Sequence, residues 1–487
     1  MITVDFSKRK NKSLCETIID SLKNKILNGD LKANEKLPSK RSFAEHLGVS
    51  VITVQNAYAQ LISEGYIYSL EKKGFYVTDL FLEKNKNANI SGKKSSVKKS
   101  IQNKTQTQKI LADFRNNSTN VQKFPFSLWA KTMRSVLNQN AEKLLARIES
   151  KGILELRKAI IKYLNEFRNI QVSEEQIVIG AGTEILYSML VQLLGSENIF
   201  AVENPGYHKV ANLIKLNGAK CVPLEIDSQG IKVEDLEKFN VNVVQVSPAH
   251  HFPTGIVMPV RRRLEILNWA KKSPKNYIIE DYYDSEFRFN GKPLQTLQSS
   301  DDSQKVIFIN TFSKTLSPSF RISYMILPKT LLEKYDKIFG NYSCSVSAFE
   351  QYTLAKFILD NNFSKHIIKM KNYYRSLRNQ LVAEFQKSKL SSVAEIREQD
   401  SGLHFLLKIK TDSSGEKLKN RLEKNGIKIN LLSDFYYFDA PKDNTFIINY
   451  SGIEKEKIPE IISTIENCVF ESSSINTHVI IGRDPII

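Results

Sequence analysis

From residue 111 to about residue 470, short apolar runs alternate with longer segments of helical periodicity. This alternation is typical of α/β folds, in which helices cover a mostly parallel sheet. Two of the apolar runs end in ionisable side chains, in the sequences YIIEDYYDSEF and KVIFINTFSKTLSPSFR. Because ligands of such sheets lie at the carboxyl ends of the strands, both runs predict polar side chains at a binding site.

The chain has 487 residues, too many for one hydrophobic core, and its texture changes along its length. Residues 1–78 form short periodic segments with turn signals, whereas residues 79–110 are polar, with eight lysines and no acidic residue between 84 and 109. A segment of this composition cannot bury enough apolar surface to offset its ordering entropy. The sequence therefore predicts a small domain at 1–78, a flexible linker at 79–110, a large domain at 111–470 and a tail at 471–487.

Composition narrows the class of protein. The chain is 41% hydrophobic and 25% charged, it has no uninterrupted apolar stretch of transmembrane length, and its first residues lack the apolar core of a signal peptide. The four cysteines lie far apart, without the spacing of metal ligands, so we expect reduced thiols, no metal and a cytoplasmic protein that meets no membrane. The net charge of +18 is compatible with nucleic-acid binding but does not establish it.

The first 78 residues predict three helices followed by a hairpin, which is the order of a winged helix-turn-helix. Apolar residues recur every four positions in the first helix, Gly48 ends the second, and Ser50 stands at the N-cap position of the third. The expected elements are helices at Leu14–Leu27, after Ser39 and after Ser50, and strands at Tyr66–Leu70 and Phe75–Val77.

In such a module the third helix lies in the major groove of double-stranded DNA and presents its N-terminal residues to base edges and phosphates. A basic side chain early in the second helix reaches a phosphate or a guanine, and lysines at the hairpin tip neutralise phosphates. A small helical bundle with solvated charges accounts for each single residue equally well. The candidate DNA contacts are Arg41, Ser50, Thr53, Gln55, Lys72 and Lys73.

The strand ends of the large domain match the chemical demands of pyridoxal 5'-phosphate. Its aldehyde needs a lysine amine for a Schiff base, its pyridine nitrogen needs a carboxylate, and its phenolic oxygen needs a hydrogen-bond donor. We assign these roles to Lys314, Asp281 and Tyr283. Asp281 and Tyr283 alternate along a strand and are therefore expected to face the same side.

The phosphate of the cofactor needs backbone N–H groups, hydroxyls and a cation. Gly182 and Thr183, in a glycine turn before a helix, would supply the backbone, and Ser313 and Arg321 would complete the cup. Tyr207, in VENPGYHKV, is placed to stack on the ring. Each residue alone also fits a solvated lysine, a capping acid or a packed turn aromatic; their common order favours the cofactor.

Two sets of segments resemble known families. ILNGDLKANEKLPSKRSFAEHLGVSVITVQNAYAQLISEGYIYSLEKKGFYV resembles the GntR-type winged helix. GILELRKAIIKYLNEFRNI, SPAHHFPTGIVMPVRRRLEIL, IEDYYDSEFRF, TFSKTLSPSFRISY and SGLHFLL resemble fold-type I aminotransferases, and in detail the MocR family, in which that winged helix precedes an aminotransferase-like domain with a large and a small part.

The resemblance implies a transcription regulator that loads pyridoxal 5'-phosphate as part of a sensor and forms a head-to-tail homodimer. Its effector would be an amino compound that displaces Lys314, or pyridoxal 5'-phosphate itself. Two alternatives stay open, a true aminotransferase with an accessory DNA-binding domain, and a regulator whose large domain only dimerises.

The chain departs from the family pattern at three places. Asn34 replaces a glycine, which is tolerable because asparagine accepts left-handed turns, and Val51 replaces an arginine that contacts DNA. The C-terminal strand TFIINYSGI has Ile447 and Ile448 and no arginine to clamp a substrate carboxylate. Lys209 would supply a weaker point charge, so we expect α-amino acids to react poorly.

Overall fold

The computed structural model describes residues 2–6, 12–71, 73–79, 110–115, 121–139, 141–289, 294–397 and 402–470. The chain divides into two compact units, Met1–Lys104 and Thr105–Ile487, with the division inside the expected linker. Apart from its two end residues, the expected linker at 79–110 lies outside the described residues, as does the expected tail at 471–487. The limits of the four predicted segments therefore stay predictions.

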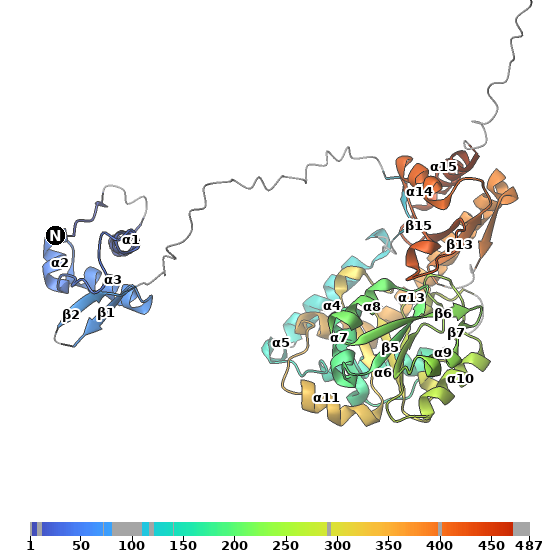
Figure 1. The fold of residues 1–487 in the computed structure, drawn as a ribbon, viewed down its shortest axis with the longest axis horizontal. Helices are drawn as coiled ribbons and strands as arrows, with labels where there is room; N and C mark the ends of the chain where they lie inside the picture. Colours follow the sequence, from blue (N-terminus) through green and yellow to red (C-terminus); the bar gives the residue numbers. More distant parts are fainter. Residues whose placement is uncertain are drawn as a thin grey trace, which may run out of the picture. The chain divides into compact units, whose positions relative to one another are not determined.

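The first unit is a winged helix-turn-helix, as the sequence predicts (Figure 1). Strand β1 pairs antiparallel with β2. Serine side chains cap all three helices: Ser13 in a capping box, and Ser39 and Ser50 through the backbone N–H three residues on. The elements are α1 (Leu14–Leu27), α2 (Lys40–Leu47), α3 (Val51–Ser63), β1 (Ile67–Leu70) and β2 (Gly74–Val77).

One core holds this unit together. Ile18 and Leu22 of α1, Phe43 of α2 and Val54 of α3 belong to the same buried cluster. Asn34 has a φ of 64°, the left-handed conformation expected of the residue that replaces glycine there. The small unit is therefore a folded domain with its own hydrophobic core.

The second unit contains an eight-stranded sheet in the order β4-β11-β10-β9-β8-β5-β6-β7. Strands β7 and β11 run antiparallel to their neighbours, and the other six are parallel to one another. The expected α/β fold is confirmed. The strands are β4 (Ile177–Gly180), β5 (Ile199–Asn204), β6 (Lys220–Asp227), β7 (Gly230–Ile231), β8 (Val243–Val246), β9 (Tyr277–Asp281), β10 (Val306–Thr311) and β11 (Ser323–Ile326).

Helices cover both faces of this sheet. Along β10, Phe308 packs in one cluster with α6 and α12, whereas Ile307 and Ile309 pack in another with α7 and α8. This alternation makes the strand apolar on both sides, as a central parallel strand requires. The helices are α4 (Phe126–Gln139), α5 (Ala141–Leu145), α6 (Leu154–Arg168), α7 (Thr183–Leu194), α8 (His208–Leu216), α9 (Val233–Lys238), α10 (Val260–Lys271), α11 (Leu332–Phe339), α12 (Ala348–Leu359) and α13 (Asn362–Lys387).

A smaller C-terminal lobe has its own core and an antiparallel sheet in the order β12-β13-β16-β15. Strand β3, at the start of the unit, pairs in parallel with β14 of this lobe. Among the described helices, none combines the length and apolar character that crossing a bilayer requires. The remaining elements are β3 (Ala112–Asp113), β12 (Ala394–Arg397), β13 (His404–Ile409), α14 (Gly415–Lys424), β14 (Ile427–Lys428), β15 (Asn430–Leu431), β16 (Thr445–Asn449) and α15 (Ile458–Phe470).

Candidate cofactor site and DNA interface

Lys314 lies in the turn that follows β10, at the carboxyl end of the strand. The turn is closed by the N–H of Leu316, which donates to the carbonyl of Phe312 at 2.8 Å. Burial lowers the pKa of Lys314, and the negative charge of Asp284 opposes this effect only in part. Because the neutral amine is the nucleophilic form, this environment suits a lysine that attacks an aldehyde.

Asp281 ends β9, the parallel neighbour of β10, and pairs in register with Ile309. Its Oδ2 accepts a hydrogen bond from the hydroxyl of Tyr187 at 2.9 Å. Its Oδ1 is buried and has no hydrogen-bond partner among the described residues. Burial, reinforced by the charge of Asp284 and opposed by Tyr187, raises the pKa of Asp281 to about 6. A buried carboxylate oxygen without a partner fits the N–H of a pyridinium ring.

Tyr283 follows two residues after Asp281. Its hydroxyl lies 3.3 Å from Nδ1 of His250, and burial holds its pKa well above the ordinary value. The hydroxyl is therefore protonated at neutral pH and able to donate, which is the property that the sequence analysis required of it.

The glycine turn before α7 forms a cradle for an anion. Gly182 has a φ of 93° and stands at the N-cap of α7 without a side-chain cap. A Cβ on Gly182 would lie 2.1 Å from Nη2 of Arg321, so the guanidinium rests against the bare glycine. Thr183 begins the helix. Uncapped N–H groups beside a guanidinium fit a phosphate.

Glu184 occupies the charged edge of this cradle, and sequence reasoning missed it. Its two carboxylate oxygens pair with Lys209 of α8 and with Arg321. Burial alone would raise the pKa of Glu184, but hydrogen bonds from both cations hold it at about 2. The only signal in the sequence is an acid in the first turn of a helix, which is common without any such role.

Ser313 and Tyr207 contact neighbouring side chains, but these contacts do not establish their predicted roles. The hydroxyl of Thr311 donates to Oγ of Ser313 at 3.0 Å. Tyr207 is half exposed and contacts Phe252 edge to face, and Phe252 in turn contacts Tyr283 edge to face. Tyr207 therefore borders the same group of residues, but its stacking role stays a prediction.

The C-terminal strand β16 offers no cation toward this site. Ile447 and Ile448 are both buried in apolar clusters, and the amide nitrogen of Asn449 donates to the carbonyl of Phe114 at 2.8 Å. The side chains of this strand thus serve packing and the attachment of the segment around β3.

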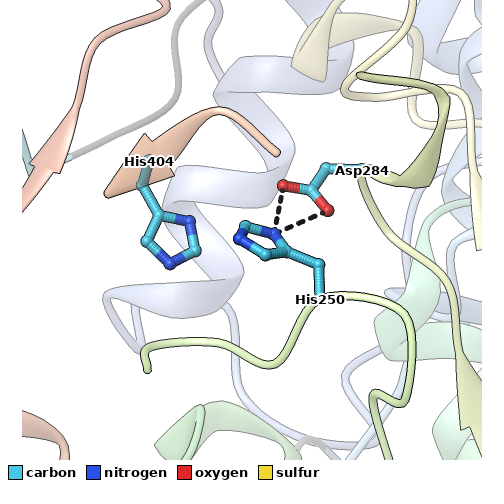
Figure 2. A group of neighbouring side chains, drawn as sticks. All are labelled: His250, Asp284 and His404. Carbon is cyan, nitrogen blue, oxygen red and sulfur yellow. Dashed lines mark hydrogen bonds and ion pairs between the residues drawn. The ribbon is translucent and has the colours of Figure 1, made fainter. Parts of the chain in front are cut away.

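Two histidines that the sequence analysis quoted only within family motifs meet near Tyr283. Figure 2 shows His250, Asp284 and His404 side by side. Nδ1 of His250 lies 3.0 Å from Oδ2 of Asp284, and the two imidazole rings have centroids 4.5 Å apart. His250 and Asp284 come from the large lobe, whereas His404 begins β13 of the C-terminal lobe. Because 154 positions separate the histidines, sequence spacing gave no sign of this contact.

In the winged helix, Ser50 first serves as a helix cap. Its Oγ accepts from the N–H of Thr53 at 3.1 Å and lies 2.7 Å from the hydroxyl of Thr53. Gln55 and Ile52 are exposed on the same helix. Arg41 and Lys73 are also exposed, whereas Lys72 lies outside the described residues.

Comparison with known proteins defines the class of this chain. Residues 103–465 match the family model of aminotransferase class I and II, and residues 14–77 match that of the bacterial regulatory proteins of the gntR family. The chain therefore belongs to the MocR family, in which a GntR-type winged helix precedes an aminotransferase-like domain.

Individual relatives match over nearly their whole length. The uncharacterized HTH-type transcriptional regulator YdeL of Bacillus subtilis is 35% identical, over 90% of this chain and 93% of its own. The probable rhizopine catabolism regulatory protein MocR of Rhizobium meliloti is 30% identical, over 92% of each chain. The pyridoxine biosynthesis transcriptional regulator PdxR of Corynebacterium glutamicum is 24% identical, over 94% of this chain and 96% of its own.

Solved structures confirm the fold of the large unit. A kynurenine aminotransferase of Pyrococcus horikoshii superposes with a TM-score of 0.65 at 22% identity, over 75% of this chain and 92% of its own. A multiple substrate aminotransferase of Thermococcus profundus gives a TM-score of 0.66 at 22% identity, over 76% and 93%. The fold is that of the fold-type I aminotransferases, as expected.

Gly182→Ala should destabilise the protein more than Gly218→Ala. Both glycines have a positive φ, but a Cβ at Gly218 meets only Ser196, at 4.0 Å, whereas one at Gly182 collides with Arg321. We expect Gly218→Ala to cost about 1 kcal/mol of unfolding free energy, and Gly182→Ala at most about 1 kcal/mol more, because the guanidinium is the flexible end of a side chain and loses its pairing with Glu184 when it moves aside. Denaturant titrations measure both losses, and equal losses would show that the guanidinium moves aside without cost.

Asp281→Asn should stabilise the cofactor-free protein at alkaline pH. The pKa of Asp281 rises from 3.8 to about 6 on folding, so stability is lost as the pH climbs through that interval. Asparagine removes this loss, and we expect a gain on the order of 1–3 kcal/mol at pH 8 and little gain at pH 4, from thermal unfolding.

Asp284→Asn is the matched control for this measurement. Burial alone would raise the pKa of Asp284, but the charge of His250 lowers it overall, so the corresponding substitution should destabilise the protein at neutral pH. If the Asp281→Asn variant were less stable than the natural protein at every pH, burial would not be raising the pKa of Asp281.

Proposed function

We propose that this protein is a transcription regulator that binds double-stranded DNA through its winged helix and carries pyridoxal 5'-phosphate on Lys314. The three relatives named above are called regulators, and each matches over more than nine-tenths of its length. The observation that carries the cofactor proposal is the unpartnered, buried Oδ1 of Asp281 on the strand beside the one that leads to Lys314.

Each side chain has a defined task toward the cofactor. Lys314 would hold it through its amine, and Oδ1 of Asp281 would accept the N–H of its ring nitrogen. The N–H groups of Gly182 and Thr183, together with Arg321, would bind its phosphate. When bound, pyridoxal 5'-phosphate supplies an aldehyde that reacts reversibly with primary amines.

The charges around the cradle indicate whether an effector with a carboxylate group can bind there. Lys209 is already neutralised by Glu184, and β16 carries isoleucines where a carboxylate clamp would stand. A free α-carboxylate would therefore find no unpaired cation at Lys209 or in β16. Of the two candidate effectors, an amino compound and pyridoxal 5'-phosphate itself, this favours the cofactor as the signal.

An aminotransferase remains the second candidate function. Lys314, Asp281 and Tyr283 keep the environment that amine chemistry needs, and the large unit has an aminotransferase fold. Turnover of amino-acid and oxo-acid pairs by the purified protein would favour it over the regulator.

We also propose that the regulator acts as a homodimer, head to tail as in its family. Two winged helices per dimer would suit two half-sites on DNA, because a twofold dimer matches a palindromic operator. Sedimentation of the full chain with and without an operator fragment tests this.

Titration of the full-length protein with pyridoxal 5'-phosphate should produce a visible absorption band, and borohydride should abolish the band while fixing the cofactor covalently to the protein. Lys314→Ala should lose the band, because the reacting amine is gone. Lys305→Ala should keep it, since Lys305 is another lysine whose pKa burial lowers, but it donates to the carbonyl of Pro274 instead. Covalently bound cofactor in borohydride-treated Lys314→Ala, or no band in the natural protein, would refute the assignment.

The same titration separates the two effector candidates. If amines or amino acids shift the band, the site senses that compound; if none does while the cofactor changes operator affinity, pyridoxal 5'-phosphate is the signal. An amine that shifts the band and also changes operator affinity would overturn our preference.

Arg41→Ala should weaken operator binding by ~1–3 kcal/mol if the guanidinium meets a guanine, and by less if it meets only a phosphate. Arg41 is exposed near the start of α2, where a base or a phosphate can reach it. Lys32→Ala removes an equal charge from an exposed position before α2 and is the control. Fluorescence anisotropy at several salt concentrations measures both; equal losses would remove Arg41 from specific recognition.

A further inference from the structure

The third helix of the small unit carries no charged side chain. α3 has the sequence VITVQNAYAQLIS, without an acid or a base at any position. The elements that adjoin it do carry charge: Lys40 and Arg41 lie in the first turn of α2, and Lys73 lies in the turn between β1 and β2. The free face of a helix in water usually carries charged side chains. The composition of α3 therefore indicates a surface that binds a partner.

One face of α3 packs inward and the opposite face is exposed. The buried residues are Val54, Ala57, Tyr58 and Leu61. The exposed residues in the first part of the helix are Val51, Ile52, Gln55, Asn56 and Ala59. Both series follow the period of a helix, so the exposed residues form one continuous surface, which we call the exposed stripe.

The exposed stripe begins with two apolar side chains and continues with two amides. Ile52 is 69% exposed and Val51 is 42% exposed, and they are neighbours in the first turn. Gln55 and Asn56 follow one turn later, and among the described residues neither amide group has a hydrogen-bond partner. The stripe thus offers apolar surface and amide groups that are free to donate and accept.

The hydroxyl groups at the start of the helix have a different task. Oγ of Ser50 accepts the N–H of Thr53 at 3.1 Å and lies 2.7 Å from the hydroxyl of Thr53. When Thr53 donates to Ser50, the hydrogen of the Ser50 hydroxyl is free to meet a phosphate. Phosphate contacts position a helix but carry no sequence information, so discrimination between bases falls to the exposed stripe.

The chemistry of the stripe matches the major-groove edge of one kind of base pair. An amide donates and accepts at once, which suits N6 and N7 of adenine, and an apolar side chain suits the C5 methyl group of thymine. Guanine is read by arginine or lysine, and cytosine by an acid. α3 has neither, and Val51 stands where the GntR-type pattern has an arginine.

The packing of the small unit keeps cations next to this uncharged helix. The ring of Tyr58 contacts Phe43 of α2 and Phe75 of β2, with centroids 6.0 and 4.9 Å apart. Nζ of Lys40 in turn lies 5.3 Å from the centroid of the Phe75 ring. Both charged elements therefore adjoin α3. This separation fits a DNA duplex, whose phosphates border the groove and whose base edges are uncharged.

We propose that α3 reads A·T base pairs in the major groove, with Val51 and Ile52 against thymine methyl groups and Gln55 and Asn56 on adenine edges. The inference rests on the proposed function, because it names the class of sequence that the winged helix binds. A guanine outside the reach of α3 is compatible with it, since Arg41 lies on α2.

Selection from a pool of random duplexes by the full-length protein, with and without pyridoxal 5'-phosphate, is the first test. We expect an enriched site in which the base pairs read by α3 are A·T. The variants Ile52→Ala and Gln55→Ala identify these base pairs, because each variant relaxes the preference at the position that its side chain contacts. Relaxed positions that are G·C in the site of the natural protein would overturn the inference.

Replacing thymine by uracil in the enriched duplex removes only the methyl group. At a thymine that Ile52 contacts, we expect the natural protein to lose affinity about fourfold, the effect of exposing one buried methyl group, and Ile52→Ala to lose nothing further. Ile62→Ala is the matched control, because Ile62 is exposed near the opposite end of α3, and it should keep the sensitivity to uracil. Fluorescence anisotropy measures these affinities. Equal binding of the thymine and uracil duplexes by the natural protein would refute the methyl contact.

Val51→Arg should add a preference that the natural protein lacks. A guanidinium forms two hydrogen bonds with O6 and N7 of guanine, so we expect the variant to favour G·C at the base pair that faces position 51 by about fivefold or more. A variant that gains no preference for guanine would overturn the assignment of this position to a base edge.

The outcomes separate this inference from the proposed function. If the natural protein enriches no sequence in either condition, the DNA-binding proposal fails, and the inference fails with it. If a sequence is enriched but the α3 variants keep its base preferences, the regulator stands and the exposed stripe does not read the bases. A change in the sedimentation of DNA-free Ile52→Ala, without a change in DNA binding, would assign the stripe to a protein contact and also overturn the inference.

Discussion

The parallel pairing of β9 with β10 is the constraint on which the site depends. The register places Asp281 opposite Ile309, so the chain that continues to Lys314 leaves the sheet at the same edge as the carboxylate. Apolar residues on both faces of β10 keep that register, since a shift by one residue would turn Phe308 out of its cluster. The parallel register therefore brings the lysine and the acid to the same edge of the sheet.

Burial then gives these groups their chemistry. The same desolvation that raises the pKa of Asp281 lowers that of Lys314, which leaves an amine and an acid in forms that water would not favour. The neighbouring charge of Asp284 raises the pKa of both groups.

Local features were predictable from the sequence, and distant contacts were not. The helix Leu14–Leu27 has the predicted bounds because its periodicity and its cap lie within the segment. The positions of Asp281 and Lys314 at strand ends could be predicted, because a short apolar run followed by polar residues marks the end of a buried strand. Glu184 could not, because its role comes from cations on α8 and after β10. His404 could not, because only the packing of two lobes brings it to His250.

The pairing of β3 determines which lobe of the second unit the chain joins after the winged helix. Ala112–Asp113 follow the segment that leads from the winged helix, yet they pair with β14 in the C-terminal lobe and not with the large sheet. Phe114 is buried in the core of that lobe. The chain that comes from the winged helix therefore enters the second unit at the lobe that carries His404, so a rotation of this lobe about the large sheet would also move this entry point.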